Sequence, residues 1–197
     1  MRSFVQTSIS LKKIVVFASG SGTNAAKIMA FFKDVARISV EKVFCNNPNA
    51  GVLQRAIKAG VPVRVFNREQ FSKEVLDELK QINPDLIVLA GFLWMIPSTY
   101  VAAFPKKIIN IHPALLPKYG GKGMYGSYVF QAIAQNGEEE TGITIHYVNE
   151  QYDEGTIIFQ ATTRLTNSDT SDEIAKKTHA LEHKHLAPTI YKLLKAQ

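Results

Sequence analysis

The stretch that decides the fold is LKKIVVFASGSGTNA, residues 11–25. Its first part, Leu11–Ala18, is rich in β-branched and other apolar residues, which predicts a strand buried on both faces. Gly20-Ser21-Gly22 then predicts a turn, and Thr23-Asn24 can cap a helix that runs to about Lys33. A buried strand, a glycine-rich turn and a helix in succession are typical of the first unit of an α/β nucleotide-binding fold.

The rest of the first half repeats this alternation of strand and helix. We expect strands at Ile38–Cys45, Val63–Phe66 and Asp85–Ala90, and helices at Ala50–Ala59 and Arg68–Gln81. Strands that alternate with helices at this spacing predict βαβ units and a largely parallel sheet.

The second half has a different pattern. We expect a short strand, a loop rich in proline and glycine, a helix and two strands, at Ile108–Ile111, Pro113–Gly126, Ser127–Gln135, Gly142–Val148 and Thr156–Thr163. A final helix should be capped by Ser171 or Asp172, and Pro188 should interrupt or kink it. The predicted fold class is α/β: a Rossmann-like, mostly parallel twisted sheet with helices on both faces and an antiparallel pair toward the C-terminal half. One domain should span residues 1–197, with residues 1–10 as a disordered extension.

Composition narrows the class of protein. The 197 residues are 46% hydrophobic and 20% charged, which excludes disordered and collagen-like chains. The single cysteine excludes an internal disulfide framework and a cysteine-built zinc module. No apolar run reaches the roughly 18 to 20 residues of a membrane span, and residues 1–10 lack the pattern of a secretory signal. We therefore expect a soluble, cytoplasmic protein with no membrane partner.

The net charge of +6 favours anionic partners. A nucleic-acid binder usually clusters its positive charge, whereas the longest runs of Lys and Arg here are pairs such as Lys12-Lys13 and Lys106-Lys107. We therefore expect small anionic substrates rather than nucleic acid.

The glycine-rich turn is the first candidate site. Gly20–Ala25 fits the G-x-G-x-x-A pattern, in which glycines let the backbone approach a phosphate and a helix N-terminus holds it. A dinucleotide site also needs an acid at the end of the second strand, where this chain has the neutral residues Cys45-Asn46-Asn47. The pattern therefore favours one phosphate over NAD, and a turn without a ligand is the alternative.

Asn110-Ile111-His112-Pro113, at the end of a strand, is the second candidate site. Residues two apart on a strand point to the same face, so Asn110 and His112 can together hold and protonate a developing oxyanion. In the loop Tyr152–Gly155, Asp153 is a candidate carboxylate neighbour that would raise the pKa of the imidazole and favour its charged form. The simpler alternatives are a histidine bonded to a turn and a solvated acidic loop.

Ligands of open α/β sheets lie outside the carboxyl ends of the strands, where the strand order reverses. We therefore expect the loops Gly20–Asn24, Gly91–Ile96 and Asn110–Pro113 to surround one crevice.

Two other sequence patterns are weaker indications of a functional site. His179, Glu182 and His183 match the H-x-x-E-H spacing of inverted zinc proteases, but no acid follows as a third ligand, so we expect no metal. Cys45 is expected to pack as a small hydrophobic residue.

Four segments together resemble the phosphoribosylglycinamide formyltransferases, folate-dependent enzymes of purine synthesis. They are Ala18–Asn24, Leu89–Phe92, Asn110–Tyr119 and Asp153–Gly155, and the resemblance runs from about Lys13 to the C-terminal helix. The Asn-x-His-Pro-x-Leu-Leu-Pro block with its downstream Asp is specific for folate-dependent formyltransferases and their hydrolase relatives. Within this group, the glycine loop narrows the resemblance to the enzymes that act on glycinamide ribonucleotide. The resemblance implies transfer of a formyl group from 10-formyltetrahydrofolate to the amine of 5-phosphoribosyl-glycinamide in de novo purine (IMP) synthesis, with no metal.

The resemblance also implies roles for individual residues. The catalytic residues would be Asn110, His112 and Asp153. The ribonucleotide would be bound by Gly22, Thr23 and Asn24 at its phosphate, and by Glu182. The formyl-folate site would comprise Arg68, Leu93, Trp94, Met95, Ile96 and Asn110.

This chain departs from the family pattern in two places. Trp94 stands where members often have Arg, and the loop Gly120–Gly126 resembles only a subset of members. The alternatives on the same core are another folate-dependent formyltransferase and a formyltetrahydrofolate hydrolase, and 197 residues leave no room for their added domains. An alternative of a different class is a non-catalytic nucleotide- or nicotinamide-binding module. We expect a monomer or a homodimer.

Overall fold

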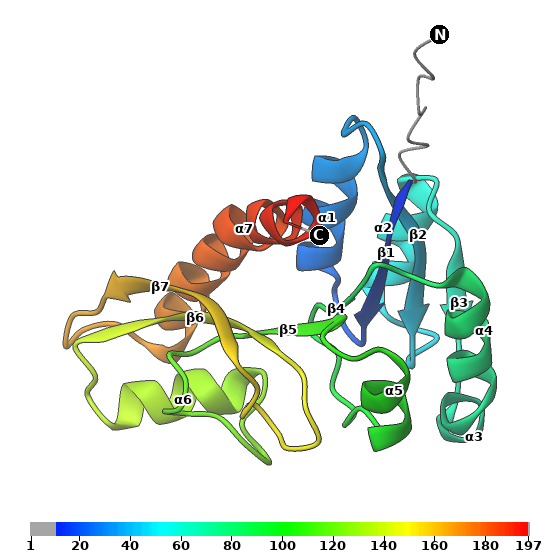
Figure 1. Ribbon diagram of the computed structural model, residues 1–197. Helices are drawn as coiled ribbons and strands as arrows, with labels where there is room; N and C mark the ends of the chain where they lie inside the picture. Colours follow the sequence, from blue (N-terminus) through cyan, green and yellow to red (C-terminus); the bar gives the residue numbers. More distant parts are fainter. Residues whose placement is uncertain (1–10, 197) are drawn as a thin grey trace, which may run out of the picture.

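The computed structural model describes residues 11–196, so the extension expected at residues 1–10 lies outside the described residues. Within them the strands form one seven-stranded sheet in the order β3-β2-β1-β4-β5-β6-β7 (Figure 1). The strands are β1 (Lys12–Ala18), β2 (Ile38–Cys45), β3 (Val63–Val65), β4 (Leu86–Leu89), β5 (Ile108–His112), β6 (Glu140–Tyr147) and β7 (Ile157–Arg164). The pairs from β3 to β5 are parallel and β5–β6 and β6–β7 are antiparallel, which confirms the predicted fold class.

Helices cover both faces of the sheet, as predicted. They are α1 (Thr23–Phe32), α2 (Gly51–Lys58), α3 (Arg68–Ser72), α4 (Glu74–Ile82), α5 (Ser98–Ala103), α6 (Ser127–Gln135) and α7 (Ser171–Lys195). In β1, Ile14 and Val16 share a core with α1 and α7, whereas Val15 and Phe17 share another with α4 and α5. Because alternate residues of a strand point to opposite faces, burial on both faces explains the continuous apolar run of β1.

A third, smaller core lies between α6 and α7. Val129, Phe130 and Ile133 of α6 pack there with Ala114, which follows β5, and Ile174 of α7. This cluster anchors the segment after β5 to the antiparallel half of the sheet, next to the site described below.

The segment predicted as one helix, Arg68–Gln81, forms two helices instead. Lys73 adopts φ −138° and ψ −62°, which breaks the helical path between α3 and α4. Phe71, Val75 and Leu79 are nevertheless buried in one cluster, so the apolar spacing continues across the break and hides it. The six-residue helix α5 was outside the prediction because it is too short to form a periodic pattern.

Two predicted helix caps are wrong. The N-cap of α1 is Gly22, and neither Thr23 nor Asn24 caps the helix. Thr170 caps α7 in a reciprocal capping box with Glu173, in place of Ser171 or Asp172. Helix α7 continues through Pro188 to Lys195, so Pro188 does not interrupt it, and the alternative of a kink stays a prediction.

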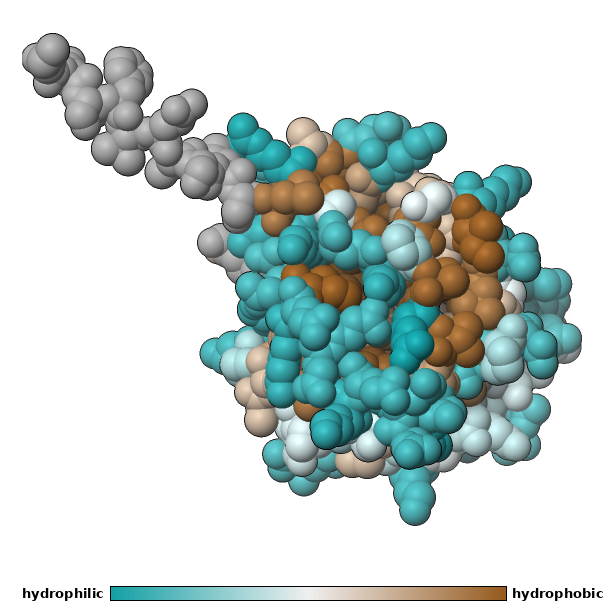
Figure 2. Space-filling model, turned by 90° about the vertical axis from the view of Figure 1, so that its right-hand side faces the viewer, coloured by the Kyte–Doolittle hydropathy of each residue, from teal (hydrophilic) through white to brown (hydrophobic). Residues whose placement is uncertain are grey.

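Seen from the side of α3 and α4, the surface is largely hydrophilic, with smaller hydrophobic areas between the polar side chains (Figure 2). Helix α4 illustrates the reason, because it buries Val75, Leu76 and Leu79 and exposes Asp77 and Lys80. No helix within residues 11–196 is both long enough and apolar enough to cross a membrane.

Candidate active site

The strand order reverses between β1 and β4, which is where ligands of open α/β sheets bind. A cavity of about 550 Å³ lies there, and the three loops predicted to converge, at residues 20–24, 91–96 and 110–113, all line it. Two hydrogen bonds join the first two loops. Ser19 N–H donates to the Gly91 carbonyl oxygen (3.0 Å), and Leu93 N–H donates to Ser19 Oγ (3.0 Å).

The glycine loop forms one end of this cavity. Gly22 has φ +75°, and a Cβ at this position would lie 2.4 Å from Val52 Cβ, so the close approach of α2 requires glycine. Thr23 and Asn24 follow in the first turn of α1 and line the cavity. The first amide N–H groups of a helix have no partner within it and carry the positive end of the helix dipole. This end of the cavity is therefore suited to an anion.

Glu182 of α7 lies next to the glycine loop. Its side chain is buried, and Oε2 accepts hydrogen bonds from Asn24 Nδ2 (2.9 Å) and from His179 Nδ1 (2.9 Å). The hydrogen bond to the Glu182 carboxylate raises the pKa of His179. The H-x-x-E-H spacing thus produces an ion pair within one helix. Between residues 11 and 196, no three His, Cys, Asp or Glu side chains are grouped as metal ligands would be.

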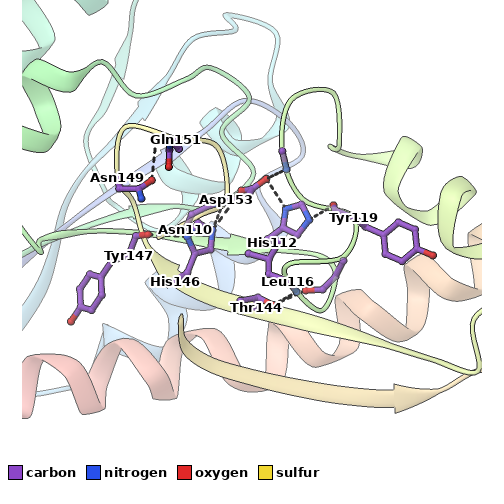
Figure 3. A network of polar contacts seen from close by, with 12 residues as sticks. Asn110, His112, Leu116, Tyr119, Thr144, His146, Tyr147, Asn149, Gln151 and Asp153 are labelled. Carbon is purple, nitrogen blue, oxygen red and sulfur yellow. Dashed lines mark hydrogen bonds and ion pairs between the residues drawn. The ribbon is translucent and has the colours of Figure 1, made fainter. Parts of the chain in front are cut away.

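Strands β5 and β6 bring the second candidate group together (Figure 3). Asn110 and His112 lie two residues apart on β5 and both line the cavity. In the antiparallel register, Asn110 pairs with His146 and His112 pairs with Thr144. His146 therefore lies directly across from Asn110, and His146 Nε2 is 3.2 Å from Asn110 Nδ2.

Asp153 lies between the two histidines. Its Oδ2 is 3.5 Å from His112 Nδ1 and accepts the Gly121 N–H at 3.0 Å, and its Oδ1 is 3.6 Å from His146 Nε2 (Figure 3). Burial raises the pKa of Asp153, but the neighbouring side chains of His146 and His112 and the Gly121 N–H together lower it below its usual value. The carboxyl group is therefore ionised at neutral pH.

The net pKa of His112 is lowered, although Asp153 contributes in the predicted direction. The Tyr119 carbonyl oxygen, which can only accept, lies 2.7 Å from His112 Nε2, so Nε2 carries a proton and Nδ1 is directed at Asp153. Burial lowers the pKa of this imidazole, and the Asp153 carboxylate and the Tyr119 carbonyl raise it by less. The Asp153 carboxylate thus acts on the pKa in the predicted direction, but the buried ring loses more solvation than the carboxylate restores, so the net pKa of His112 is lowered.

His146 is the residue that the sequence prediction missed. Its Nδ1 is 2.9 Å from the Tyr147 carbonyl oxygen, so Nδ1 carries the proton and Nε2 accepts from Asn110 Nδ2. The second Nδ2 hydrogen of Asn110 points to Asp153 Oδ1 at 3.4 Å. Asn110 is thus oriented by two acceptors. The available signal was a histidine in an otherwise apolar, alternating strand, ITIHY, which must pair with a neighbouring strand.

Gly155 holds the loop of Asp153 against β6. A Cβ at residue 155 would lie 1.6 Å from the Tyr147 carbonyl oxygen, so only glycine permits this contact. The Tyr147 N–H donates to the Thr156 carbonyl oxygen at 2.9 Å and continues the pairing from the strand into the loop.

The residues expected to bind the formyl donor are divided between two cavities. Leu93, Trp94, Met95 and Ile96 line the main cavity. Arg68 does not line it. Its guanidinium lies 3.9 Å over the Trp94 ring, and both residues line a second cavity of about 440 Å³.

Comparison with known proteins agrees with this geometry. The sequence model of the formyl transferase family matches residues 12–190. The chain is 41% identical over 181 residues to a chloroplastic phosphoribosylglycinamide formyltransferase of Arabidopsis thaliana, covering 88% of this chain and 62% of that protein. It is 36% identical over 191 residues to the phosphoribosylglycinamide formyltransferase of Bacillus subtilis, covering 93% of this chain and 95% of that protein.

The solved structures give the same result. A phosphoribosylglycinamide formyltransferase structure from Bacillus halodurans superimposes with a TM-score of 0.85 at 34% identity, covering 94% of this chain and 97% of that chain. The chain spans about three fifths of the two plant relatives, 62% and 59%. By both sequence and structure, the chain belongs to the formyl transferase family, in the group of the phosphoribosylglycinamide formyltransferases.

Proposed function

We propose that this chain transfers the formyl group of 10-formyltetrahydrofolate to the amine of 5-phosphoribosyl-glycinamide, giving formylglycinamide ribonucleotide and tetrahydrofolate. The observation that carries the proposal is the position of Asp153, whose carboxylate lies between His112 and His146 beside the Asn110 amide. These groups share one cavity with a glycine loop suited to a phosphate.

The ribonucleotide binds at the glycine-loop end in this proposal. Gly22, Thr23 and Asn24 hold its phosphate through backbone N–H groups and the dipole of α1. Glu182, already fixed by Asn24 and His179, accepts hydrogen bonds from the ribose hydroxyls. The donor enters from the side of Leu93–Ile96, so that its formyl carbon meets the amine beside Asn110.

Two side chains stabilise the oxygen that becomes negative when the amine attacks the formyl carbon. The Nδ2 hydrogen of Asn110 that makes the long contact with Asp153 Oδ1 (3.4 Å) turns to donate to this oxygen instead. The other Nδ2 hydrogen keeps its hydrogen bond to His146. His112 donates from Nδ1 once that atom carries a proton. Each such donor contributes about 10²- to 10³-fold to the rate.

Side chains of the site can carry the one proton transfer that the reaction requires. The donor supplies an activated formyl group, and one proton must pass from the attacking amine to the leaving N10 nitrogen. Asp153, ionised and next to His112, accepts this proton through water and passes it to His112 Nδ1. The developing oxyanion favours the charged imidazole and offsets its burial. His112 then returns the proton to N10 as the C–N bond breaks.

A spectrophotometric assay with the ribonucleotide and 10-formyltetrahydrofolate tests the proposal. We expect turnover by the native chain and losses of about 10²-fold or more in His112→Ala and Asp153→Asn. Equal turnover in all three proteins would refute the catalytic assignment. Formyl loss from the donor without ribonucleotide would identify a hydrolase instead.

A further inference from the structure

The turn that follows β5 contacts both members of the His112–Asp153 pair. The Tyr119 carbonyl oxygen lies 2.7 Å from His112 Nε2, and the Gly121 N–H donates to Asp153 Oδ2 at 3.0 Å. One short backbone segment, residues 119–121, thus supplies a hydrogen-bond partner to each of the two side chains. Whatever fixes this segment therefore also fixes the geometry of the pair.

Tyr119 holds its carbonyl in this place with an unfavourable backbone conformation. Its φ is +58°, in the left-handed region that a residue with a Cβ rarely adopts. Such a conformation persists only where the surrounding contacts determine it. The side chain is partly buried against the small core between α6 and α7, while the carbonyl faces His112 (Figure 3). The position of the carbonyl therefore depends on contacts of the tyrosine side chain.

The Tyr119 hydroxyl is held by two side chains at the end of α6. Asn136 Nδ2 donates to the hydroxyl oxygen at 2.8 Å, and the hydroxyl donates to Glu138 Oε1 at 2.8 Å. Hydrogen bonds from Tyr119 and Lys118 lower the pKa of Glu138, so its carboxylate is charged at neutral pH and the hydroxyl bond is charge-assisted. Tyr119, Asn136 and Glu138 line neither cavity, so this cluster reaches the site through the Tyr119 backbone.

The end of α6 fixes the two side chains that hold the hydroxyl. Gly137 has φ +61°, and its N–H donates to the Ala134 carbonyl oxygen at 3.2 Å. The Glu138 N–H donates to the Ile133 carbonyl oxygen at 3.5 Å. This pair of hydrogen bonds is a Schellman motif, in which a left-handed glycine ends a helix. Asn136 and Glu138 therefore flank one defined turn, and both reach the same hydroxyl.

We propose that Glu138 and Asn136 are positioning residues that act on the catalytic imidazole through Tyr119. They keep the hydrogen of the neutral His112 ring on Nε2 and leave Nδ1 as the atom that takes up the proton. This inference rests on the proposed function, in which His112 Nδ1 receives the proton from Asp153. A carbonyl oxygen can only accept, so Nε2 must donate for as long as the Tyr119 carbonyl stays in place. Once the carbonyl is released, the hydrogen can lie on Nδ1, and this atom can then no longer accept a proton.

NMR measures the tautomer of His112 directly, in the absence of substrates. The ¹⁵N shifts of both ring nitrogens are recorded with the ring neutral, and His112→Gln identifies the signals of this residue by difference. In the native chain we expect a protonated Nε2 and a bare Nδ1. Tyr119→Phe keeps the aromatic ring and removes the hydroxyl, so the two shifts should move toward each other as the second tautomer becomes populated. Glu138→Ala should have the same effect.

Kinetics separates positioning from a structural role. In Tyr119→Phe and in Glu138→Ala, kcat should fall about three- to tenfold, while KM for both substrates changes by less than about twofold. Glu138→Gln keeps an acceptor for the hydroxyl and should recover most of the loss. Because the two residues act through one hydrogen bond, the double variant should lose no more than Tyr119→Phe alone. Glu139→Ala removes an exposed acid next to Glu138 and is the matched control, which should behave as the native chain does.

Three results would overturn the inference. They are a native His112 ring with its hydrogen on Nδ1, shifts that are the same in the native chain and in both Tyr119→Phe and Glu138→Ala, and a loss that appears in KM rather than in kcat. Circular dichroism establishes that each variant is folded, and Glu138→Ala carries the test if Tyr119→Phe is not. Because NMR requires no substrate, the tautomer is decided even if the chain transfers no formyl group. A fixed Nε2 tautomer in a chain without transfer would refute the proposed function alone.

Discussion

The two ends of the main cavity are built in different ways. The glycine-loop end uses backbone N–H groups of a turn and a helix in the parallel half of the sheet. Gly22 is the N-cap of that helix. The other end uses side chains of the antiparallel half, where the register of β5 and β6 places His146 across from Asn110. Backbone sites depend on local chain geometry, whereas the side-chain site depends on a long-range register. Substitutions should therefore change binding and folding at the first end and turnover at the second.

The largest effect is expected for Asp153→Asn. The amide keeps the size of the side chain but removes the charge between His112 and His146, so kcat should fall about 10³-fold while KM for the ribonucleotide changes little. Steady-state kinetics measures both constants. Glu154→Gln, an exposed neighbour, is the matched control and should retain activity. If Asp153→Asn mainly raised KM for the ribonucleotide, this result would contradict the assignment of binding to one end and turnover to the other.

Gly22→Ala should act on folding and on the glycine-loop end. Its Cβ would overlap Val52 and its φ of +75° is costly for alanine, so the free energy of unfolding should fall by about 2–4 kcal/mol. Urea unfolding measures the change. Gly20→Ala is the control for stability, since no atom lies within 4 Å of its added Cβ, and it should shift unfolding by less than about 0.5 kcal/mol. Equal losses in both variants would contradict the close-approach argument.

His146→Ala tests whether orientation of Asn110 matters at the side-chain end. Without the acceptor at Nε2, the amide loses one of its two fixed partners, and kcat should fall about tenfold. His146→Gln offers an amide oxygen as an alternative acceptor and should recover part of the loss. The orienting role would be refuted if both variants lost activity equally.

The smallest effect is a difference in how the two ends respond to pH. The pKa of His112 is lowered in the folded chain, so its contribution to stability is present above about pH 6.5 and lost on acidification. The pKa of His179 is raised, so its contribution is present below about pH 6.5 and lost as pH rises through the folded value. Urea unfolding at several pH values should therefore show a flatter acid side in His112→Gln and a flatter alkaline side in His179→Gln. Parallel curves for the two variants would contradict this assignment.

Local sequence patterns predicted most of the fold. Strand β2 was predicted with its observed bounds, Ile38–Cys45, because a buried strand of eight residues has a clear apolar pattern. The break at Lys73 and the short helix α5 could not be predicted, because neither interrupts or creates a periodic pattern. Local patterns report burial, and they do not report where the backbone turns within a buried surface.

The candidate site was predictable only where its residues are close in sequence. Asn110 and His112 follow from their spacing on one strand, and the glycine loop follows from its motif. His146 requires the register of β5 and β6, and the pKa of His112 requires the burial of its ring. Both depend on contacts between segments distant in sequence. The roles of these side chains stay predictions until the variants above are measured.

The contact at Gly155 has a consequence for proton placement. The Tyr147 carbonyl that leaves no space for a larger residue at 155 is also the acceptor for His146 Nδ1. A methyl group at 155 would push that carbonyl aside, and the imidazole would be free to carry its hydrogen on the other nitrogen, facing Asn110. The absence of a side chain at residue 155 thus selects the tautomer of the His146 ring, which orients the Asn110 amide.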